Sequence, residues 1–233
     1  ATTVRPMTSL LEEYLAYLIH IDAVGAKAKY AKECNAVLPK ISKEKKIYFK
    51  NAVHPVLWRK NMQQQIETIP QTIQLHQKQQ IIVISGPNAG GKSITLKTIG
   101  LLQIMLQSGL LIPVDERSET YIFENILTDI GDNQSIENQL STYSYRLKNM
   151  RSFLRKCNAE TLFLIDEFGT GSDPELGGAL AEIFLEEFYN NGAFGIITTH
   201  YSNLKVLANE LENVTNANMQ FDERSLEPLY KLF

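Results

Sequence analysis

The sequence of 233 residues is poor in several features that would each mark a class of protein. It has only two cysteines, Cys34 and Cys157, which fit no metal-binding or redox spacing. Isolated thiols are typical of a reducing compartment. We find no signal peptide and no apolar run of ~18 residues, so we expect neither secretion nor a membrane span. The sequence therefore predicts a cytoplasmic protein with no membrane partner.

An excess of positive charge is also missing. Lys and Arg number 23 against 26 Asp and Glu, which gives a formal net charge of -3. A strongly basic nucleic-acid-binding chain is therefore excluded, and any contact with DNA must be local or lie outside this chain. A hydrophobic content of 44% is enough for one sizeable core and one or two domains.

The most informative feature present is a β-branched run that leads into a glycine loop. Residues 81–85 read IIVIS and continue as GPNAGGKS, which matches G-x-x-x-x-G-K-[ST]. In this pattern backbone N–H groups surround a β-phosphate, Lys92 reaches the β- and γ-oxygens, and Ser93 offers its hydroxyl to Mg²⁺. The following helix directs its positive end at the same anion. The sequence thus predicts a nucleotide phosphate site at Gly86, Pro87, Asn88, Ala89, Gly90, Gly91, Lys92 and Ser93.

Two adjacent carboxylates end a second apolar run, LFLIDE at residues 162–167. Side chains alternate between the faces of a strand, so the two acids cannot share one role. We assign Asp166 to Mg²⁺, directly or as an outer ligand, and Glu167 to orienting or deprotonating the attacking water. A third run at 194–200 ends on His200, at the edge where open α/β sheets bind ligands. His200 is a candidate sensor of the γ-phosphate, and a structural histidine is the alternative.

Hydrophobic periodicity elsewhere predicts strands and helices in alternation. Helices are expected over residues 9–38, 94–107, 135–156, 174–189 and 203–209. Strands or β character are expected over 47–49, 53–58, 111–114, 119–123, 126–129, 214–221 and 229–233, with an exposed loop over 59–68. Such alternation is typical of an α/β fold with a wound, mostly parallel sheet and helices on both faces.

Three segments, GPNAGGKS at 86–93, DEFGTGSD at 166–173 and TTHY at 198–201, together resemble the ATPase domain of MutS proteins. The segments DIGDNQSI at 129–136 and LSTYS at 140–144 look more specifically like the second bacterial MutS subfamily, the one with a C-terminal Smr domain. The resemblance covers nearly the whole chain. Within it, residues 53–56 match the short strand that precedes the P-loop in that family.

The resemblance implies an ABC-type P-loop ATPase, in which two ATPase domains close two nucleotide sites between them. Gln134 corresponds to a loop that reports on the γ-phosphate. Ser141 and Thr142 fall where the signature serine of one subunit caps ATP bound to the other; an ordinary polar turn in a helix is the alternative. Residues 169–173 would lie at the dimer seam, with His200 as the switch histidine.

The resemblance also implies a division of the chain. Residues 1–46 would be a helical remnant of the core and lever region, and residues 47–233 a P-loop ATPase domain truncated at its C-terminus. We therefore expect a homodimer in the full-length protein, a largely monomeric and slow fragment, and contact with DNA or other nucleic acid through regions absent here. The family's adenine-stacking aromatic has no counterpart near residues 68–70, which leaves adenine recognition open.

The chain is accordingly predicted to bind ATP and Mg²⁺ and to hydrolyse ATP. In the full-length protein, ATP-driven dimer closure would be coupled to DNA in recombination control or repair. Two other hypotheses stay open. An ABC-type nucleotide-binding subunit of another machine would need a glycine-rich signature that residues 140–144 do not supply. A nucleotide-dependent interaction module without efficient turnover is disfavoured by the presence of both acids and His200.

Overall fold

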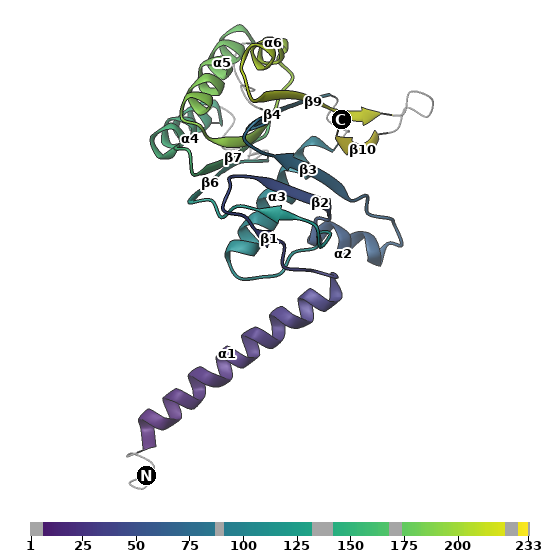
Figure 1. Cartoon of the computed structure of the whole chain (residues 1–233), viewed down its shortest axis with the longest axis vertical. Helices are drawn as coiled ribbons and strands as arrows, with labels where there is room; N and C mark the ends of the chain where they lie inside the picture. Colours follow the sequence, from purple (N-terminus) through teal and green to yellow (C-terminus); the bar gives the residue numbers. More distant parts are fainter. Residues whose placement is uncertain (1–6, 87–90, 132–141, 168–173, 222–227, 233) are drawn as a thin grey trace.

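The computed structural model describes residues 7–86, 91–131, 142–167, 174–221 and 228–232 (Figure 1). Its larger sheet consists of β4 (Ile81–Ser85), β6 (Asn125–Asp129), β7 (Thr161–Ile165), β8 (Phe194–Thr198), β9 (Val214–Phe221) and β10 (Pro228–Leu232). The order across this sheet is β10-β9-β4-β8-β7-β6. The β10 strand runs antiparallel to β9, and the other neighbouring pairs are parallel. The carboxyl ends of β4, β7 and β8 therefore meet at one edge.

The central strands are buried on both faces, as their continuous apolar runs require. In β4, Ile82 and Ile84 face one core cluster, whereas Ile81 and Val83 face the other. Helix α3 (Lys92–Gln107) packs in the first cluster. Helices α4 (Thr142–Lys156), α5 (Pro174–Asn190) and α6 (Ser202–Glu210) pack in the second (Figure 1). The predicted wound, mostly parallel sheet with helices on both faces is confirmed.

A second, four-stranded sheet lies on the far side of α3 (Figure 1). It consists of β1 (Lys40–Ile41), β2 (Ile47–Ala52), β3 (Gln71–Leu75) and β5 (Glu119–Thr120), in the order β1-β5-β2-β3. Buried residues of β2 and β3 share the core cluster of α3, among them Phe49 and Ile73. Helix α3 is therefore held between the two sheets, and this packing fixes the position of Lys92, its first residue.

Several sequence predictions are wrong at the edges of this second sheet. The predicted β character over 53–58 and loop over 59–68 give way to helix α2 (Pro55–Gln63). Pro55 suits the first turn because its φ is already helical, and the ring nitrogen Nδ1 of His54 accepts a hydrogen bond from the N–H of Leu57 at 3.2 Å. The expected strand over 111–114 is reduced to an isolated bridge between Val37 and Ile112.

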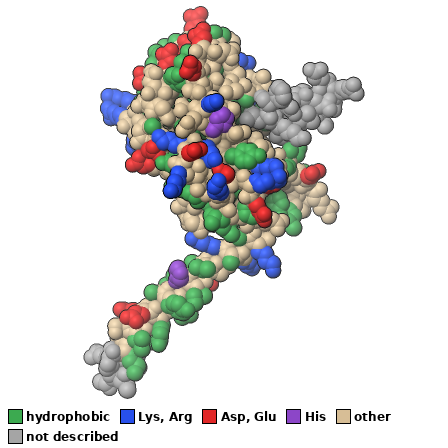
Figure 2. Space-filling model, viewed as in Figure 1, with side chains coloured by type: hydrophobic (Ala, Val, Ile, Leu, Met, Phe, Trp, Pro, Cys, Tyr) green, Lys and Arg blue, Asp and Glu red, His purple; other side chains and the backbone are tan. Residues whose placement is uncertain are grey.

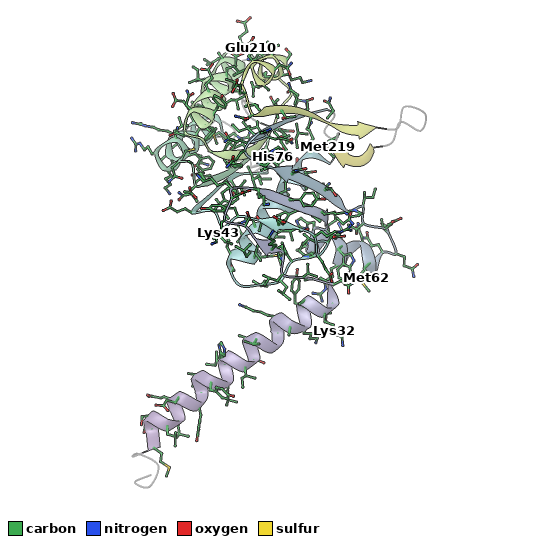
Figure 3. All side chains as sticks on the ribbon, viewed as in Figure 1. Lys32, Lys43, Met62, His76, Glu210 and Met219 are labelled. Atoms are coloured by element: carbon green, nitrogen blue, oxygen red, sulfur yellow. The ribbon has the colours of Figure 1, made fainter. Side chains whose placement is uncertain are left out.

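Helix α1 (Thr8–Glu33) stands out from the body and approaches it toward its C-terminal end, where Nζ of Lys27 donates a hydrogen bond to the carbonyl of Ser108 at 3.4 Å (Figures 1 and 3). It ends before the predicted Leu38 because Asn35 adopts a left-handed φ of 49°. Apolar side chains cover its length (Figure 2) and are 42–63% exposed: Leu10, Leu11, Tyr14, Leu15, Tyr17, Leu18, Ile19, Ile21 and Val24. The expected helical segment is present; the predicted boundary at residue 46 stays a prediction. Among the described helices, none is long and apolar enough to cross a membrane.

We expect Gly195→Ala to destabilise the fold. A Cβ at Gly195 would lie 2.5 Å from the ring of Phe163, its partner on β7, and that ring is stacked on Phe188 with 4.4 Å between centroids. Overpacking of this kind lowers the free energy of unfolding by about 1–3 kcal/mol. Gly25→Ala on α1 is the control, because nothing lies within 4 Å of a Cβ there. Urea titration followed by circular dichroism measures both, and equal midpoints would contradict the expectation.

Candidate functional site

The residues that follow β4, β7 and β8 converge at one edge of the larger sheet. Gly86 follows β4, Asp166 and Glu167 follow β7, and His200 lies two residues after β8. These three strands are adjacent in the sheet. In open α/β sheets, this edge is where ligands bind.

Lys92 begins α3 and is 1% exposed. Its ammonium donates a hydrogen bond to the backbone carbonyl of Gly86. Gly86 and Gly91 have φ values of 120° and 90°, which glycine adopts readily and other residues do not. Burial lowers the pKa of Lys92 below its ordinary value, although the nearby carboxylates of Glu167 and Asp166 oppose this shift. The arrangement thus leaves a buried cation beside the glycine loop, where an anion would stabilise it.

Thr198 holds both predicted acids at the end of β7. Its hydroxyl donates to Oδ1 of Asp166 at 2.5 Å and accepts from the backbone N–H of Glu167 at 2.7 Å. Asp166 is 5% exposed, so this hydrogen bond partly replaces lost hydration. We did not predict Thr198 as a site residue, although its position at the tip of a buried strand was a signal.

His200 lies beside Glu167. Its Nε2 is 3.9 Å from Oε1 of Glu167, which is too long for a hydrogen bond. The His200 side chain is 45% exposed and can therefore reorient. The structure brings together Lys92, Asp166, Glu167 and His200, whose chemical roles stay predictions.

A cavity of about 110 Å³ lies between the acids and α3. Its lining residues are Ser93, Lys97, Gly131, Arg146, Asp166 and Glu167. The two predicted Mg²⁺ ligands, Ser93 and Asp166, therefore share one cavity. Their hydroxyl and carboxylate oxygens suit Mg²⁺, which proteins usually hold through one or two side chains together with substrate phosphates and water. The described residues contain no group of three or more His, Cys, Asp or Glu that could hold a metal.

A larger cavity of about 560 Å³ adjoins the first, and Ser93 and Lys97 line both. Its apolar walls include Leu57 from α2 and Ile66 and Ile69 from the segment before β3. Its polar lining includes an amide, Asn61, that is held by Thr68 at 3.0 Å. The volume lies in the range of small-molecule pockets. Sequence reasoning missed this cavity because it did not foresee α2.

Several predicted site residues lie outside the described residues. They are Pro87, Asn88, Ala89, Gly90, Gln134, Ser141 and the segment 169–173. Thr142 begins α4, but its side chain is not among those that the structure describes. Their predicted roles stay predictions. Lys97 and Arg146 line the smaller cavity and were not predicted.

Comparison with known proteins identifies the family. The family model of MutS domain V matches residues 82–232. Proteins named Endonuclease MutS2 are similar over most of the chain: that of Finegoldia magna is 46% identical over 215 residues, 92% of this chain and 27% of that protein. Those of Enterococcus faecalis and Pediococcus pentosaceus are 45% and 43% identical over 93% and 98% of this chain.

The chain spans only 27% or 28% of the length of these curated relatives. The matched residues 82–232 include β7 and β8 and nearly all of β4, the three strands that end at the candidate site. The chain belongs to the MutS family, in its MutS2 branch, and carries the MutS-type ATPase domain.

Proposed function

We propose that the chain binds ATP together with Mg²⁺ and hydrolyses the bound ATP. The observation that carries this proposal is the convergence of Lys92, Asp166 and Glu167 at the carboxyl edge of three adjacent strands. A buried cation beside a glycine loop suits the phosphates. Thr198 holds the carboxylate of Asp166 and the backbone N–H of Glu167, and these two adjacent acids suit a metal ion and a water molecule.

Phosphoryl transfer requires mainly positioning and charge stabilisation from the protein. Lys92 would contact the β- and γ-phosphates, and Ser93 and Asp166 would hold Mg²⁺. When bound, Mg²⁺ would neutralise charge on the phosphate oxygens. Thr198 keeps Asp166 in place, Glu167 orients the attacking water, and His200 responds to the γ-phosphate.

The larger cavity supports a place for the adenine base. It begins at Gly91 and Ser93 of the P-loop and extends between α2 and the segment before β3. Leu57 and Ile69 offer apolar contact to the faces of the ring, and the polar groups of the lining can contact its edge. Aliphatic packing would thus replace the aromatic stacking that the sequence lacks near residues 68–70.

We further propose that ATP closes a homodimer, in which Ser141 and Thr142 of one subunit cap the nucleotide of the other. Closure would be coupled to DNA or other nucleic acid through regions outside this chain, in recombination control or repair. Family membership favours this assembly over an ABC-type subunit of another machine. An interaction module that binds ATP without efficient turnover is the competing proposal, and steady-state turnover with Mg²⁺ separates the two.

Mixing two inactive variants tests the shared site. We expect Ser141→Ala and Lys92→Ala to be inactive alone and to recover turnover when mixed. In the mixed dimer, one site then has both defects and the other has Lys92 from one subunit and Ser141 from its partner. Phosphate release by each variant alone and by the mixture measures the effect. Mixed dimers that are demonstrated by mass spectrometry and yet stay inactive would contradict the shared-site model.

A further inference from the structure

Arg146 differs from every other basic residue of α4. This helix contains five basic residues and no acidic ones. Lys148, Arg151, Arg155 and Lys156 are exposed, whereas the side chain of Arg146 is only 16% exposed. Taking a guanidinium out of water is unfavourable unless protein groups replace the lost hydration. The partners of Arg146 therefore indicate why it turns inward.

Those partners belong to the candidate site. Nη1 of Arg146 donates a hydrogen bond to the backbone carbonyl of Glu167 at 3.2 Å. Its Nε lies 4.0 Å from Oδ2 of Asp129, at the end of the neighbouring strand β6. Arg146 also lines the smaller cavity with Ser93 and Asp166. The contact to Glu167 has hydrogen-bond length, whereas the distance to Asp129 is that of an ion pair.

Glu167 has an unusual backbone. Its φ is 51°, in the left-handed region that residues other than glycine seldom adopt. Such a conformation persists only where the surroundings hold it. The N–H of Glu167 is held by Thr198 at 2.7 Å, and its carbonyl is held by Arg146. Polar contacts on both sides of the Cα atom therefore fix the direction in which the Glu167 side chain leaves the backbone.

We propose that Arg146 is a positioning residue for Glu167, which it serves by holding the left-handed backbone that directs the carboxylate toward the cavity of Ser93 and Asp166. This inference rests on the proposed hydrolysis of ATP. Arg146 lies on the second turn of α4, and α4 begins at Thr142, in the segment proposed to cap the partner's nucleotide. The contact therefore links the proposed water-orienting group to the helix that begins in that segment.

The first test compares Arg146→Ala with Arg151→Ala, an exposed arginine on the same helix. We expect Arg146→Ala to lower kcat by about 10- to 100-fold, because small displacements of a catalytic group have effects of this size. Its Kd for ATP should match that of Arg151→Ala, because Lys92 and the glycine loop are untouched, and its loss of melting temperature should be small beside the loss of kcat. A kcat equal to that of Arg151→Ala would overturn the proposal, as would equal losses in kcat, affinity and melting temperature.

Chemical rescue distinguishes positioning from packing. Millimolar guanidinium ion should raise kcat of Arg146→Ala and leave the parent and Arg151→Ala unchanged, because the small cation can occupy the space between Asp129 and the carbonyl of Glu167. A loss of kcat that guanidinium does not reverse would assign Arg146 to packing and overturn the proposal.

Hydrogen exchange separates this inference from the proposed function. Arg146→Ala should accelerate amide exchange in the peptide that contains Glu167, and Arg151→Ala should not. Unchanged exchange would overturn the inference even if the parent hydrolyses ATP. Accelerated exchange in Arg146→Ala, together with a parent that binds ATP without turnover, would instead support the backbone contact and reject the proposed hydrolysis.

Discussion

Lys92→Ala should weaken ATP binding and lower hydrolysis by about 10²-fold or more, the loss typical of one preorganised charged donor in a closed site. Lys92 is buried with its ammonium on the carbonyl of Gly86, and burial lowers its pKa. The charge is therefore held where it is poorly solvated, and phosphate oxygens would compensate it. Fluorescent ATP binding and phosphate release measure the two losses.

The same burial predicts that replacing Lys92 does not lower the melting temperature of the nucleotide-free protein. Because burial disfavours the charged form of Lys92, Lys92→Met, which keeps most of the volume, should melt no earlier than the parent in the absence of nucleotide. It should, however, lose the rise in melting temperature that ATP gives the parent. Lys148→Met on the exposed face of α4 is the matched control. Parent-like ATP binding and turnover in the Lys92 variants would remove the central claim.

The centre of the fold could be predicted because its strands are buried on both faces. A strand of this kind reads as a continuous apolar run, and a residue of the candidate site follows each of β4, β7 and β8 within two positions. Their parallel pairing then brings Gly86, Asp166 and His200 to one edge without further information. Local sequence and tertiary position agree here, so pattern reasoning succeeds.

The walls of the larger cavity could not be predicted in the same way. Residues 53–58 contain valine, leucine and tryptophan and were interpreted as β structure, yet Pro55 begins a helix that His54 caps. The β3 strand alternates between buried and exposed residues and has glutamines at both kinds of position, which conceals its pattern. Because the sequence pattern predicts neither α2 nor β3, it does not predict the cavity that they line.

Tertiary placement also decides residues that look alike in sequence. Arg146 and Arg151 are both arginines in a basic helix, and only the packing of α4 beside β6 and α5 turns one of them toward Glu167. The left-handed backbone of Glu167 has no signature in the sequence either, because it follows from contacts with Thr198 and Arg146. Residues whose role depends on tertiary packing in this way cannot be identified from the sequence alone.

Glu167→Gln should separate binding from chemistry. The change keeps the shape of the side chain and leaves intact the backbone contacts to Thr198 and Arg146, so ATP and Mg²⁺ should still bind. It removes the charge that orients or deprotonates water, for which we expect a loss of about 10²- to 10⁴-fold in hydrolysis. Single-turnover hydrolysis and equilibrium ATP binding measure the two steps independently.

Two variants sharpen the assignment of Glu167. Glu186→Gln, at an exposed position of α5, controls for the loss of one acidic charge and should behave as the parent. Asp166→Asn should instead shift the Mg²⁺ concentration needed for activity upward, because it weakens the proposed metal contact while Thr198 can still hold the amide. Turnover at the parent rate in Glu167→Gln would show that Glu167 is not the catalytic carboxylate. Distinct roles predict that Glu167→Gln loses hydrolysis and that Asp166→Asn loses Mg²⁺ affinity. An equal shift in the Mg²⁺ concentration needed by both variants would instead mean that the two acids share the metal.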